Sequence, residues 1–507
     1  MNVSFLPMLS ILIGLPLVGA LLIALVAHVK WAKMIALTTA VLELLVAVTL
    51  VFTFDTSHAD FQFIEQYAWI PTFHATFFLG IDGISVLFLP MTALLVLVTI
   101  IASWHSVQSL TRLHYALLLV LESATIGVFS ALDMLLFFLF WEATLPPLFF
   151  LIGLWGVGAK RSHAALKYTL FMLCGGVPLL FAIILLAVNH AHQMGELLTQ
   201  GLSFSFPVLL NTPMPDHLQT VILCLLILGF AVKTPLVPFH TWLPTVAMES
   251  PTQLSALLTG LKLGAFGLLR FALPLAPNVA GHYAWLLALF GAVTLIYGAL
   301  IALQQTNLRQ LLAYLSISHV GFVTMGIASL TLQGLQGAIF QLLNFTLIAS
   351  SLMLMAGFIQ QRLGSTELVH LGGIAKVMPT CTVFFYLCSV ASIGMPLTSG
   401  FPAELLLIIG TFKYQFGLGV VGLFGSILGV AALFMFIQKT FLGEARHLPI
   451  HQLVDLRFHE VWALCLSSLL ILIFGLWPQY VFDITQGSLA LWLNRFLNLP
   501  LTLSFIS

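Results

Sequence analysis

Long apolar runs follow one another along almost the whole chain, separated by short polar stretches. An uncharged run of 18 or more residues is typical of a helix that crosses a membrane, since a hydrocarbon layer about 30 Å thick needs about 20 helical residues. Lipid offers no partner for an open backbone, and runs of this length are too long for barrel strands. The pattern therefore predicts fourteen spans, at 4–27, 32–54, 77–104, 113–131, 133–155, 164–188, 218–239, 251–274, 283–303, 308–329, 335–359, 379–412, 416–441 and 461–483.

Composition supports an all-α integral membrane protein. Of the 507 residues, 60% are hydrophobic and 7% are charged, whereas a soluble domain carries about 25% charged residues. The net charge is zero, which gives no indication of a nucleic-acid partner. The five cysteines lie inside apolar runs, at spacings unlike those of zinc or iron–sulfur ligands. We therefore expect one helical bundle without a metal or cofactor of its own.

The charges between the spans predict the orientation. Basic residues fall in alternate loops, at Lys30, Lys33, Arg112, Lys160, Arg161, Arg309, Arg362, Lys376, Arg446 and Arg457. The opposite loops, 55–76 and 189–217, contain Asp55, Asp60, Glu65, Glu196 and Asp216 but no Lys or Arg. Such an asymmetry places the basic loops in the cytoplasm and both termini outside. The tail at 486–505 is amphipathic and is expected to lie along the membrane surface.

Prolines interrupt the seventh and twelfth spans, in FAVKTPLVPFHTWLP and SIGMPLTSGFPAELLLIIG. Broken backbone survives at membrane depth only where protein or a water-filled cavity satisfies it. Two broken helices five spans apart are typical of inverted-repeat transporters, although two unrelated proline kinks would give the same pattern. The repeat reading divides the chain into an N-terminal part (1–112), a first repeat (113–274), a second repeat (283–441) and a C-terminal part (461–507).

The ionisable residues inside these spans are the candidate functional residues. A charge at mid-bilayer costs about 2.5–3.5 kcal/mol on insertion scales, so such groups pair, line water or titrate. Glu142 and Lys233 lie on neighbouring spans, and Lys233 comes two residues before the break at Pro235. Burial favours a neutral amine and a nearby carboxylate favours a charged one, so relative movement of the two groups would switch proton binding. The alternative is a static ion pair that fixes helix packing.

Further ionisable residues extend this line across the chain. Lys262 lies in TGLKLGAFG, where the three glycines form one small helix face; the alternative role for Lys262 is a side chain that snorkels to the interface. Glu404 follows the second break, where a carboxylate also suits a helix N-terminus. Together with His319, these residues alternate acid and base, as proton relays do. Glu122 is a possible member of the path, and Glu43 has no clear role.

Several motifs, in order along almost the whole chain, resemble the M-type, antiporter-like subunits of respiratory complex I. They are IDGISVL (81–87), LDMLLFFLFWEATLPPLFFLIGLWG (132–156), AVKTPLVPFHTWLP (231–244), LKLGAFGLLRFALPLAP (261–277) and LLAYLSISHVGF (311–322). The resemblance implies fourteen helices with two inverted five-helix repeats and one proton channel. It implies that Glu142, Lys233, Lys262 and Glu404 form the relay. It also implies that His319 and Asp133 match the family's helix-ten histidine and an acidic residue before helix five.

The resemblance also implies a function and a setting. The subunit would move protons within an NADH:quinone oxidoreductase in a bacterial inner membrane, beside L-type and N-type neighbours and lipid. NADH, FMN, iron–sulfur clusters and quinone would bind to partner subunits. The alternatives are a multisubunit cation/proton antiporter, a membrane-bound hydrogenase, an inorganic-carbon uptake complex, or a scaffold with an inactive channel.

One departure from the family pattern falls on the expected path. Phe345 occupies the position of the usual helix-eleven histidine, which would link Lys262 to Glu404. Water, Asn344 or Thr346 would then have to replace that histidine as the carrier. The sequence therefore predicts that the transfer of a proton from Lys262 to Glu404 differs from that of the family.

Overall fold

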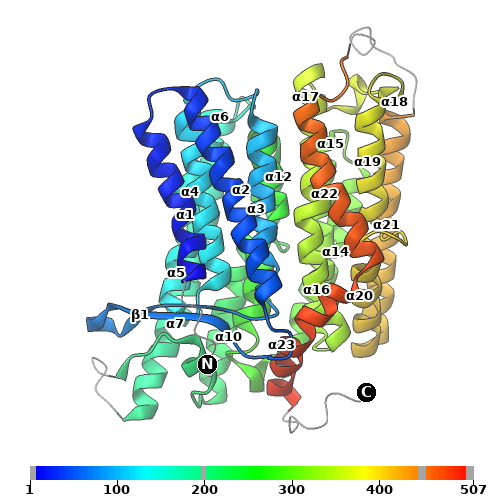
Figure 1. Cartoon of the computed structure of the whole chain (residues 1–507). Helices are drawn as coiled ribbons and strands as arrows, with labels where there is room; N and C mark the ends of the chain where they lie inside the picture. Colours follow the sequence, from blue (N-terminus) through cyan, green and yellow to red (C-terminus); the bar gives the residue numbers. More distant parts are fainter. Residues whose placement is uncertain (1–6, 196–200, 443–452, 498–507) are drawn as a thin grey trace.

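The computed structural model describes residues 7–195, 201–442 and 453–497. In this part the chain forms a bundle of helices with one small β-hairpin at its lower end in Figure 1. The helices of the first half are α1 (Met8–Leu25), α2 (Val29–Thr53), α3 (Phe88–Ser103), α4 (Thr111–Ser130), α5 (Met134–Ala143), α6 (Leu145–Trp155), α7 (Arg161–Met194), α9 (Phe206–Leu210), α10 (Asp216–Lys233), α11 (Trp242–Glu249), α12 (Thr252–Gly260) and α13 (Leu263–Gly267). Those of the second half are α14 (Pro277–Leu303), α15 (Leu308–Ala328), α16 (Leu332–Asn344), α17 (Ser350–Leu363), α18 (Ile374–Val377), α19 (Pro379–Ser392), α20 (Gly400–Tyr414), α21 (Phe416–Thr440), α22 (Phe458–Leu476) and α23 (Gln479–Leu497).

The helices identify an integral membrane protein. Within the described residues, twelve helices are long and apolar enough to cross a membrane. Two shorter apolar helices, Phe88–Ser103 and Pro379–Ser392, fall where the third and twelfth spans were predicted. Lengths of this kind match the thickness of a hydrocarbon layer.

The β-hairpin corrects the prediction of a purely helical chain. Strand β1 (Gln62–Ile70) pairs antiparallel with β2 (Ala75–Ile81). The predicted span at 77–104 is therefore wrong over 77–87, because helix α3 begins only at Phe88. From β1, the Glu65 carboxylate accepts bonds from the Leu9 and Ser10 amides, which start helix α1. The hairpin thus satisfies helix-end donors that would otherwise have no partner.

Prolines end two helices at the positions of the candidate residues. Pro146 and Pro147 carry no amide hydrogen for the carbonyls four residues earlier, and helix α5 ends just before them. Thr144 is the single residue between α5 and α6. Helix α10 ends at Lys233, two residues before Pro235, and helix α11 starts at Trp242 after one 3₁₀ turn at Phe239–Thr241.

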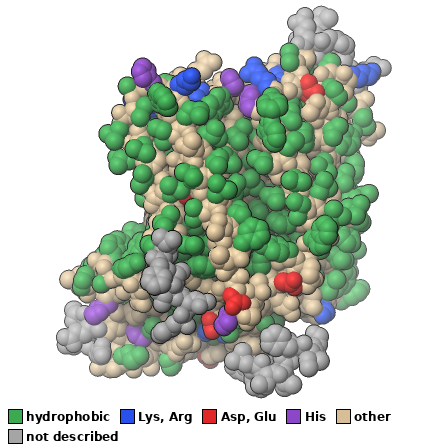
Figure 2. All heavy atoms as spheres, viewed as in Figure 1, with side chains coloured by type: hydrophobic (Ala, Val, Ile, Leu, Met, Phe, Trp, Pro, Cys, Tyr) green, Lys and Arg blue, Asp and Glu red, His purple; other side chains and the backbone are tan. Residues whose placement is uncertain are grey.

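The ends of the bundle differ in charge, as Figure 2 shows for one face: Lys and Arg gather mainly at the upper end. Arg309 is an exception to its predicted place in a loop. Its side chain is fully buried at the start of α15, where the guanidinium donates to the Ser250 carbonyl, the Ser255 hydroxyl and the Gln360 side chain. Arg362 is also engaged, in an ion pair of 2.5 Å with Glu460. Arg446 and Glu196 lie outside the described residues.

The C-terminal part bends after the last candidate span. Helix α22 ends at Leu476, and α23 follows from Gln479, so the predicted span at 461–483 ends early. Helix α23 lies at the lower end of the bundle in Figure 1, near the hairpin. Its Ser488 hydroxyl accepts from the Gly83 amide and donates to the Ala59 carbonyl. The predicted amphipathic tail is helical as far as Leu497, and 498–505 lie outside the described residues.

Candidate functional site

Lys233 is held at the junction between helices α5 and α6. Its ammonium group donates to the Thr144 hydroxyl at 2.9 Å and to the Trp141 carbonyl at 3.2 Å. The ammonium nitrogen also lies 4.0 Å from the centre of the Trp141 ring, a cation–π distance. The junction supplies these ligands because the prolines after Thr144 break the helical hydrogen-bond pattern.

Glu142 does not form an ion pair with Lys233 in this structure. Among the described residues its carboxylate is not within ion-pair distance of any cation, and its buried Oε1 atom has no hydrogen-bond partner. The carboxylate lies instead against Gly176 of α7, where an added Cβ would sit 2.3 Å from Oε1. Glu142 and Lys233 still act on each other electrostatically. This conformation therefore does not contain a static Glu142–Lys233 ion pair.

A small cavity lies beside the Lys233 ammonium. Its volume is about 30 Å³, which exceeds the roughly 10–15 Å³ that a single water needs. Polar walls come from Lys233, Thr144, Thr125 and Tyr168. The other lining residues are Leu121, Leu148, Trp242, Leu257, Leu258, Leu261 and Leu263. Because Leu261 and Leu263 flank Lys262 in the sequence, the cavity reaches from one lysine toward the next.

Lys262 lies in a helix break, not in the middle of a continuous helix as the sequence suggested. Helix α12 ends at Gly260 and α13 begins at Leu263. The freed Gly260 carbonyl accepts from the Thr346 hydroxyl at 3.3 Å. Gly264 allows this region to contact the end of α10, since an added Cβ there would meet the Thr234 amide nitrogen at 2.4 Å. The two lysine-bearing breaks are therefore in direct contact.

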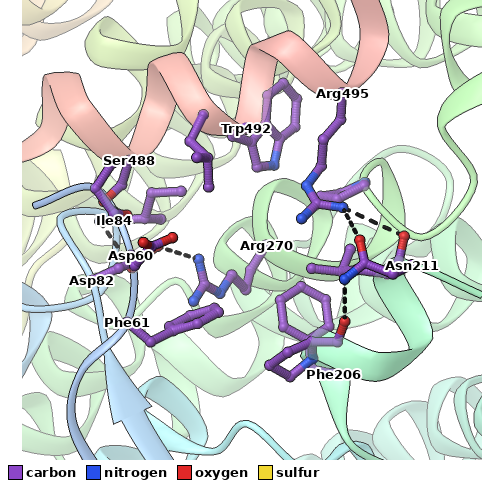
Figure 3. Close-up of a pocket in the computed structure, with 15 residues that line it drawn as sticks. Asp60, Phe61, Asp82, Ile84, Phe206, Asn211, Arg270, Ser488, Trp492 and Arg495 are labelled. Carbon is purple, nitrogen blue, oxygen red and sulfur yellow. Dashed lines mark hydrogen bonds and ion pairs between the residues drawn. The ribbon is translucent and has the colours of Figure 1, made fainter. Parts of the chain in front are cut away.

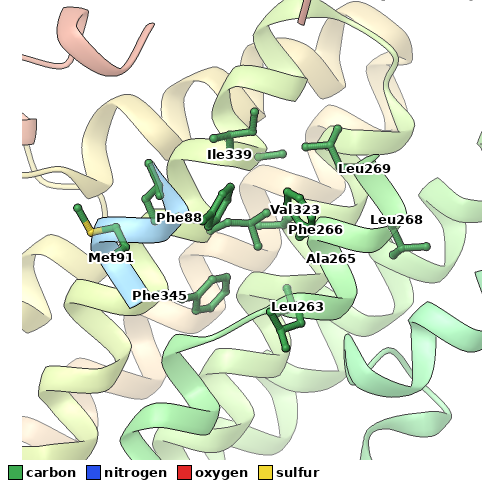
Figure 4. Close-up of a cluster of buried hydrophobic side chains, with 14 of the residues drawn as sticks. Phe88, Met91, Leu263, Ala265, Phe266, Leu268, Leu269, Val323, Ile339 and Phe345 are labelled. Carbon is green, nitrogen blue, oxygen red and sulfur yellow. The ribbon is translucent and has the colours of Figure 1, made fainter. Parts of the chain in front are cut away.

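Phe345 lies beside both Lys262 and His319. The Lys262 ammonium lies 5.0 Å from the centre of the Phe345 ring, and the His319 ring is 6.4 Å from it, centre to centre. Within the described part of the chain, the Lys262 ammonium makes no hydrogen bond. Phe345 opens a π-helical turn, Phe345–Ala349, and Figure 4 shows it beside Leu263 in a cluster of buried apolar side chains. The ring stabilises the ammonium but can neither accept nor pass on a proton.

Asn344 and Glu404 are the candidate proton carriers after Phe345. The Asn344 amide donates to the Ser399 carbonyl at 3.0 Å, just before helix α20, and its buried Oδ1 has no partner. Glu404 is the fifth residue of α20 and makes no capping hydrogen bond to the free amides of the first turn. Its carboxylate lies against Gly394, where an added Cβ would meet Oε2 at 2.7 Å.

Three more acids lie outside this row. Glu43 of α2 and Glu122 of α4 are completely buried, their carboxylate oxygens have no hydrogen-bond partner, and they act on each other electrostatically. Asp133 caps α5, because its Oδ1 atom accepts from the Leu135 and Leu136 amides, and its Oδ2 atom accepts from the Thr76 amide of β2. Burial raises the pKa of Asp133, and these amide bonds oppose the rise.

Sequence reasoning missed the ligands that hold Lys233. Trp141 and Thr144 flank Glu142, and the two following prolines were the signal that a carbonyl here would be free for another donor. Tyr168 was also missed; it is buried on α7, lines the cavity and stacks edge-on against Trp242. In all, the structure brings together Glu142 with Lys233 and Lys262 with His319, but it puts no other ionisable group in contact with Glu404 among the described residues.

This fold and these groups define the class of the protein, a multi-span membrane protein with a row of ionisable side chains in its interior. The chain belongs to the NADH:quinone oxidoreductase/Mrp antiporter transmembrane family, whose model matches residues 131–429. It is 35% identical over 501 residues to "NADH-quinone oxidoreductase subunit M" of Rickettsia typhi, covering 97% of this chain and 99% of that protein.

Solved structures show the same fold. A chain of respiratory complex I from Thermus thermophilus is 29% identical, with a TM-score of 0.87, over 96% of this chain and 99% of that chain. A chain of the Mrp complex from Dietzia sp. has the same fold, with a TM-score of 0.84 at 22% identity over 97% of this chain and 98% of that chain.

Proposed function

We propose that this protein is a proton-translocating membrane subunit of a complex I-type NADH:quinone oxidoreductase. The observation that carries the proposal is Lys233, a buried ammonium held at a proline-broken helix junction beside Glu142 and a hydratable cavity. The near full-length likeness to proteins named subunit M supports the same function. The redox reaction itself would take place in partner subunits.

The proton would move along the row Glu142, Lys233, Lys262 and Glu404. Movement at Thr144 would shift both Glu142 and the ligands of Lys233, and so change how tightly Lys233 holds its proton. Water in the cavity would carry the proton from Lys233 toward Lys262. His319 would share the proton with Lys262, and Glu122, one helical turn from Thr125 of the cavity wall, would feed the row from the α2–α4 side.

The step from Lys262 to Glu404 would avoid the Phe345 ring. Asn344 supports this route, since its Oδ1 is free while its amide reaches the Ser399 carbonyl at the start of α20. Thr346 is the less favoured carrier because its hydroxyl is already bound to the Gly260 carbonyl. A chain of water past Asn344 would complete the transfer.

The proposal includes a topology of fourteen crossings. The shorter helices α3 and α19 would be the third and twelfth crossings, and α10 with α11 and α19 with α20 would be the two broken helices. Two inverted repeats, 113–274 and 283–441, would then follow an N-terminal part (1–112) and precede a C-terminal part (461–507). Both termini would face the periplasm of a bacterial inner membrane, and L-type and N-type antiporter-like subunits would be the lateral neighbours.

Substitution of the carrying residues tests the relay. In inverted membrane vesicles, Glu142→Ala and Lys233→Ala are expected to remove this subunit's contribution to the proton gradient driven by NADH oxidation, whereas Lys413→Ala, at an exposed position of α20, leaves the gradient unchanged. Normal pumping in both relay variants would overturn the mechanism.

A second function, monovalent cation/proton antiport within a multisubunit antiporter, is favoured by the fold shared with the Mrp complex. The subunit composition of the purified complex separates the two functions. Flavin and iron–sulfur subunits are expected for the first proposal. A set of antiporter-type membrane subunits alone would support the second, and nickel–iron subunits would indicate a hydrogenase.

A further inference from the structure

A second, larger cavity lies at the hairpin end of the bundle, away from the relay. Its volume is about 200 Å³, and we call it the outer pocket (Figure 3). It is bordered by the segment before β1, the start of the loop after β2, the ends of α9 and of the Thr252–Ala272 span, and helix α23. The pocket far exceeds the space for one water but is smaller than the roughly 300–1,000 Å³ of drug-sized sites, so it suits a small polar group.

Arg270 forms the floor of the outer pocket. Its guanidinium makes a buried ion pair of 2.6 Å with Asp82, and the Phe61 and Phe206 rings lie 4.7 Å and 5.4 Å from its central carbon. Figure 3 shows the guanidinium projecting among these side chains. Only one of its five N–H donors is used by Asp82, and a guanidinium binds phosphate oxygens through paired donors.

Arg495 reaches into the same pocket from α23, and its charge has no acidic partner within ion-pair distance among the described residues. Its donors meet the Leu210 carbonyl at 3.4 Å and the Asn211 side chain at 3.5 Å, beyond the usual 2.7–3.2 Å. Burial, and then the positive charge of Arg270, lower the pKa of Arg495. Two guanidinium groups therefore face one space with most of their donors uncommitted.

A negative charge stands at the edge of the same pocket. Asp60 is exposed, lines the cavity and makes no hydrogen bond or ion pair to another described residue. With Asp82 paired to Arg270, the pocket offers the Arg495 guanidinium, the unused donors of Arg270 and the free Asp60 carboxylate. This arrangement complements a ligand that carries an anion and a cation a few bonds apart.

We infer that the outer pocket binds the headgroup of a zwitterionic phospholipid, with its phosphate at Arg270 and Arg495 and its ammonium group at Asp60. The location favours a lipid, because the pocket opens under an amphipathic helix, α23, next to the ends of membrane-spanning helices. Trp492 lies at the pocket wall, and tryptophan is typical of the headgroup level. Leu491, Leu210 and Pro274 supply apolar surface for the start of the acyl chains.

The test measures phospholipid retained by the purified complex after detergent washing and re-addition of phosphatidylethanolamine. Arg495→Gln is expected to lower the apparent affinity for this lipid about 10- to 100-fold, the loss of one charge-assisted hydrogen-bonded contact. Arg495→Lys keeps the charge but loses the paired donors, so its affinity for the lipid is expected to lie between those of the wild type and Arg495→Gln. Lys413→Gln, a basic residue exposed at the end of α20, is the matched control and should bind as the wild type does.

A second comparison identifies the ligand. Asp60→Asn is expected to remove the preference for phosphatidylethanolamine over phosphatidylglycerol, which lacks the ammonium group, while leaving total retention of phospholipid nearly unchanged. Equal retention by Arg495→Gln and Lys413→Gln would overturn the inference, as would displacement of the lipid by millimolar inorganic phosphate alone. Proton pumping is measured in parallel, and the inference about the lipid depends only on the retention of phospholipid.

Discussion

Gly176 of α7 offers a way to move the Glu142 carboxylate without removing a charge. An alanine Cβ at this position would lie 2.3 Å from the Glu142 Oε1 atom. Ordinary contacts of a Cβ begin at 3.4 Å, so the carboxylate of a Gly176→Ala variant must retreat by about 1.1 Å. Alanine favours the helix by about 0.5–1 kcal/mol relative to glycine, and α7 should therefore remain folded.

The expected functional loss follows from this displacement. Misplacement of a catalytic group by about 1 Å can cost a rate factor of about 100. Because the carboxylate end is flexible and part of the shift is absorbed by rotation, we expect Gly176→Ala to slow proton transfer through Glu142 between about 10- and 100-fold. Electron transfer in partner subunits would slow to the extent that it is coupled to proton transfer through Glu142.

The assay is NADH-driven acidification of inverted vesicles, normalised to the amount of assembled complex. Gly153→Ala on α6 is the matched control, because its added Cβ would meet only the Ala165 Cβ at 3.8 Å, an ordinary contact. We expect wild-type pumping from the control. Wild-type pumping from Gly176→Ala as well, with the complex fully assembled, would refute the idea that the position of Glu142 matters.

Three further expectations concern other residues. Asn344→Leu should lower proton pumping at least about tenfold in the vesicle assay, because it removes the free carbonyl oxygen beside Phe345; unchanged pumping would exclude this route. Asp82→Asn breaks a buried ion pair with Arg270 and should destabilise the subunit by about 3–5 kcal/mol, seen as a lower temperature of thermal unfolding; an unchanged temperature would contradict the pairing. Burial raises the pKa of Asp455, but the Thr380 and neighbouring amides outweigh it and hold this pKa below its usual range. The stabilisation is therefore complete above about pH 4 and is lost as the pH falls through the folded-state pKa, so the protection of the Thr380 amide against hydrogen exchange, relative to the intrinsic rate at each pH, should fall in acid, and Asp455→Asn should not show this fall.

Much of the fold was readable from the sequence because spanning helices obey a length rule and prolines interrupt them. Helices α5 and α10 end shortly before Pro146 and Pro235. Proline has no amide hydrogen, so the helical hydrogen-bond pattern cannot continue through these positions. The hairpin was missed because only the six residues 82–87 separate the apolar residues of β2 from those of α3, and the two were read as one apolar run. An apolar run of this kind fits a strand and a helix equally well.

The site was harder to predict in its details. The row of ionisable residues came from the sequence, but the break at Lys262 did not, because no proline marks it. That break depends on a tertiary bond from Thr346 to Gly260 and on close contact at Gly264. The missing Glu142–Lys233 ion pair has a similar origin: the Trp141 carbonyl and ring compete for the ammonium group, and only the folded chain presents them.

The most direct test of the central claim is the number of protons translocated per NADH oxidised by the reconstituted complex carrying Lys233→Ala. Lys413→Ala serves as its control. We expect the Lys233→Ala complex to translocate fewer protons per NADH, by the share that this subunit contributes, and the control complex to match the wild type. A Lys233→Ala complex that assembles fully and keeps the wild-type ratio would contradict a proton path through this lysine.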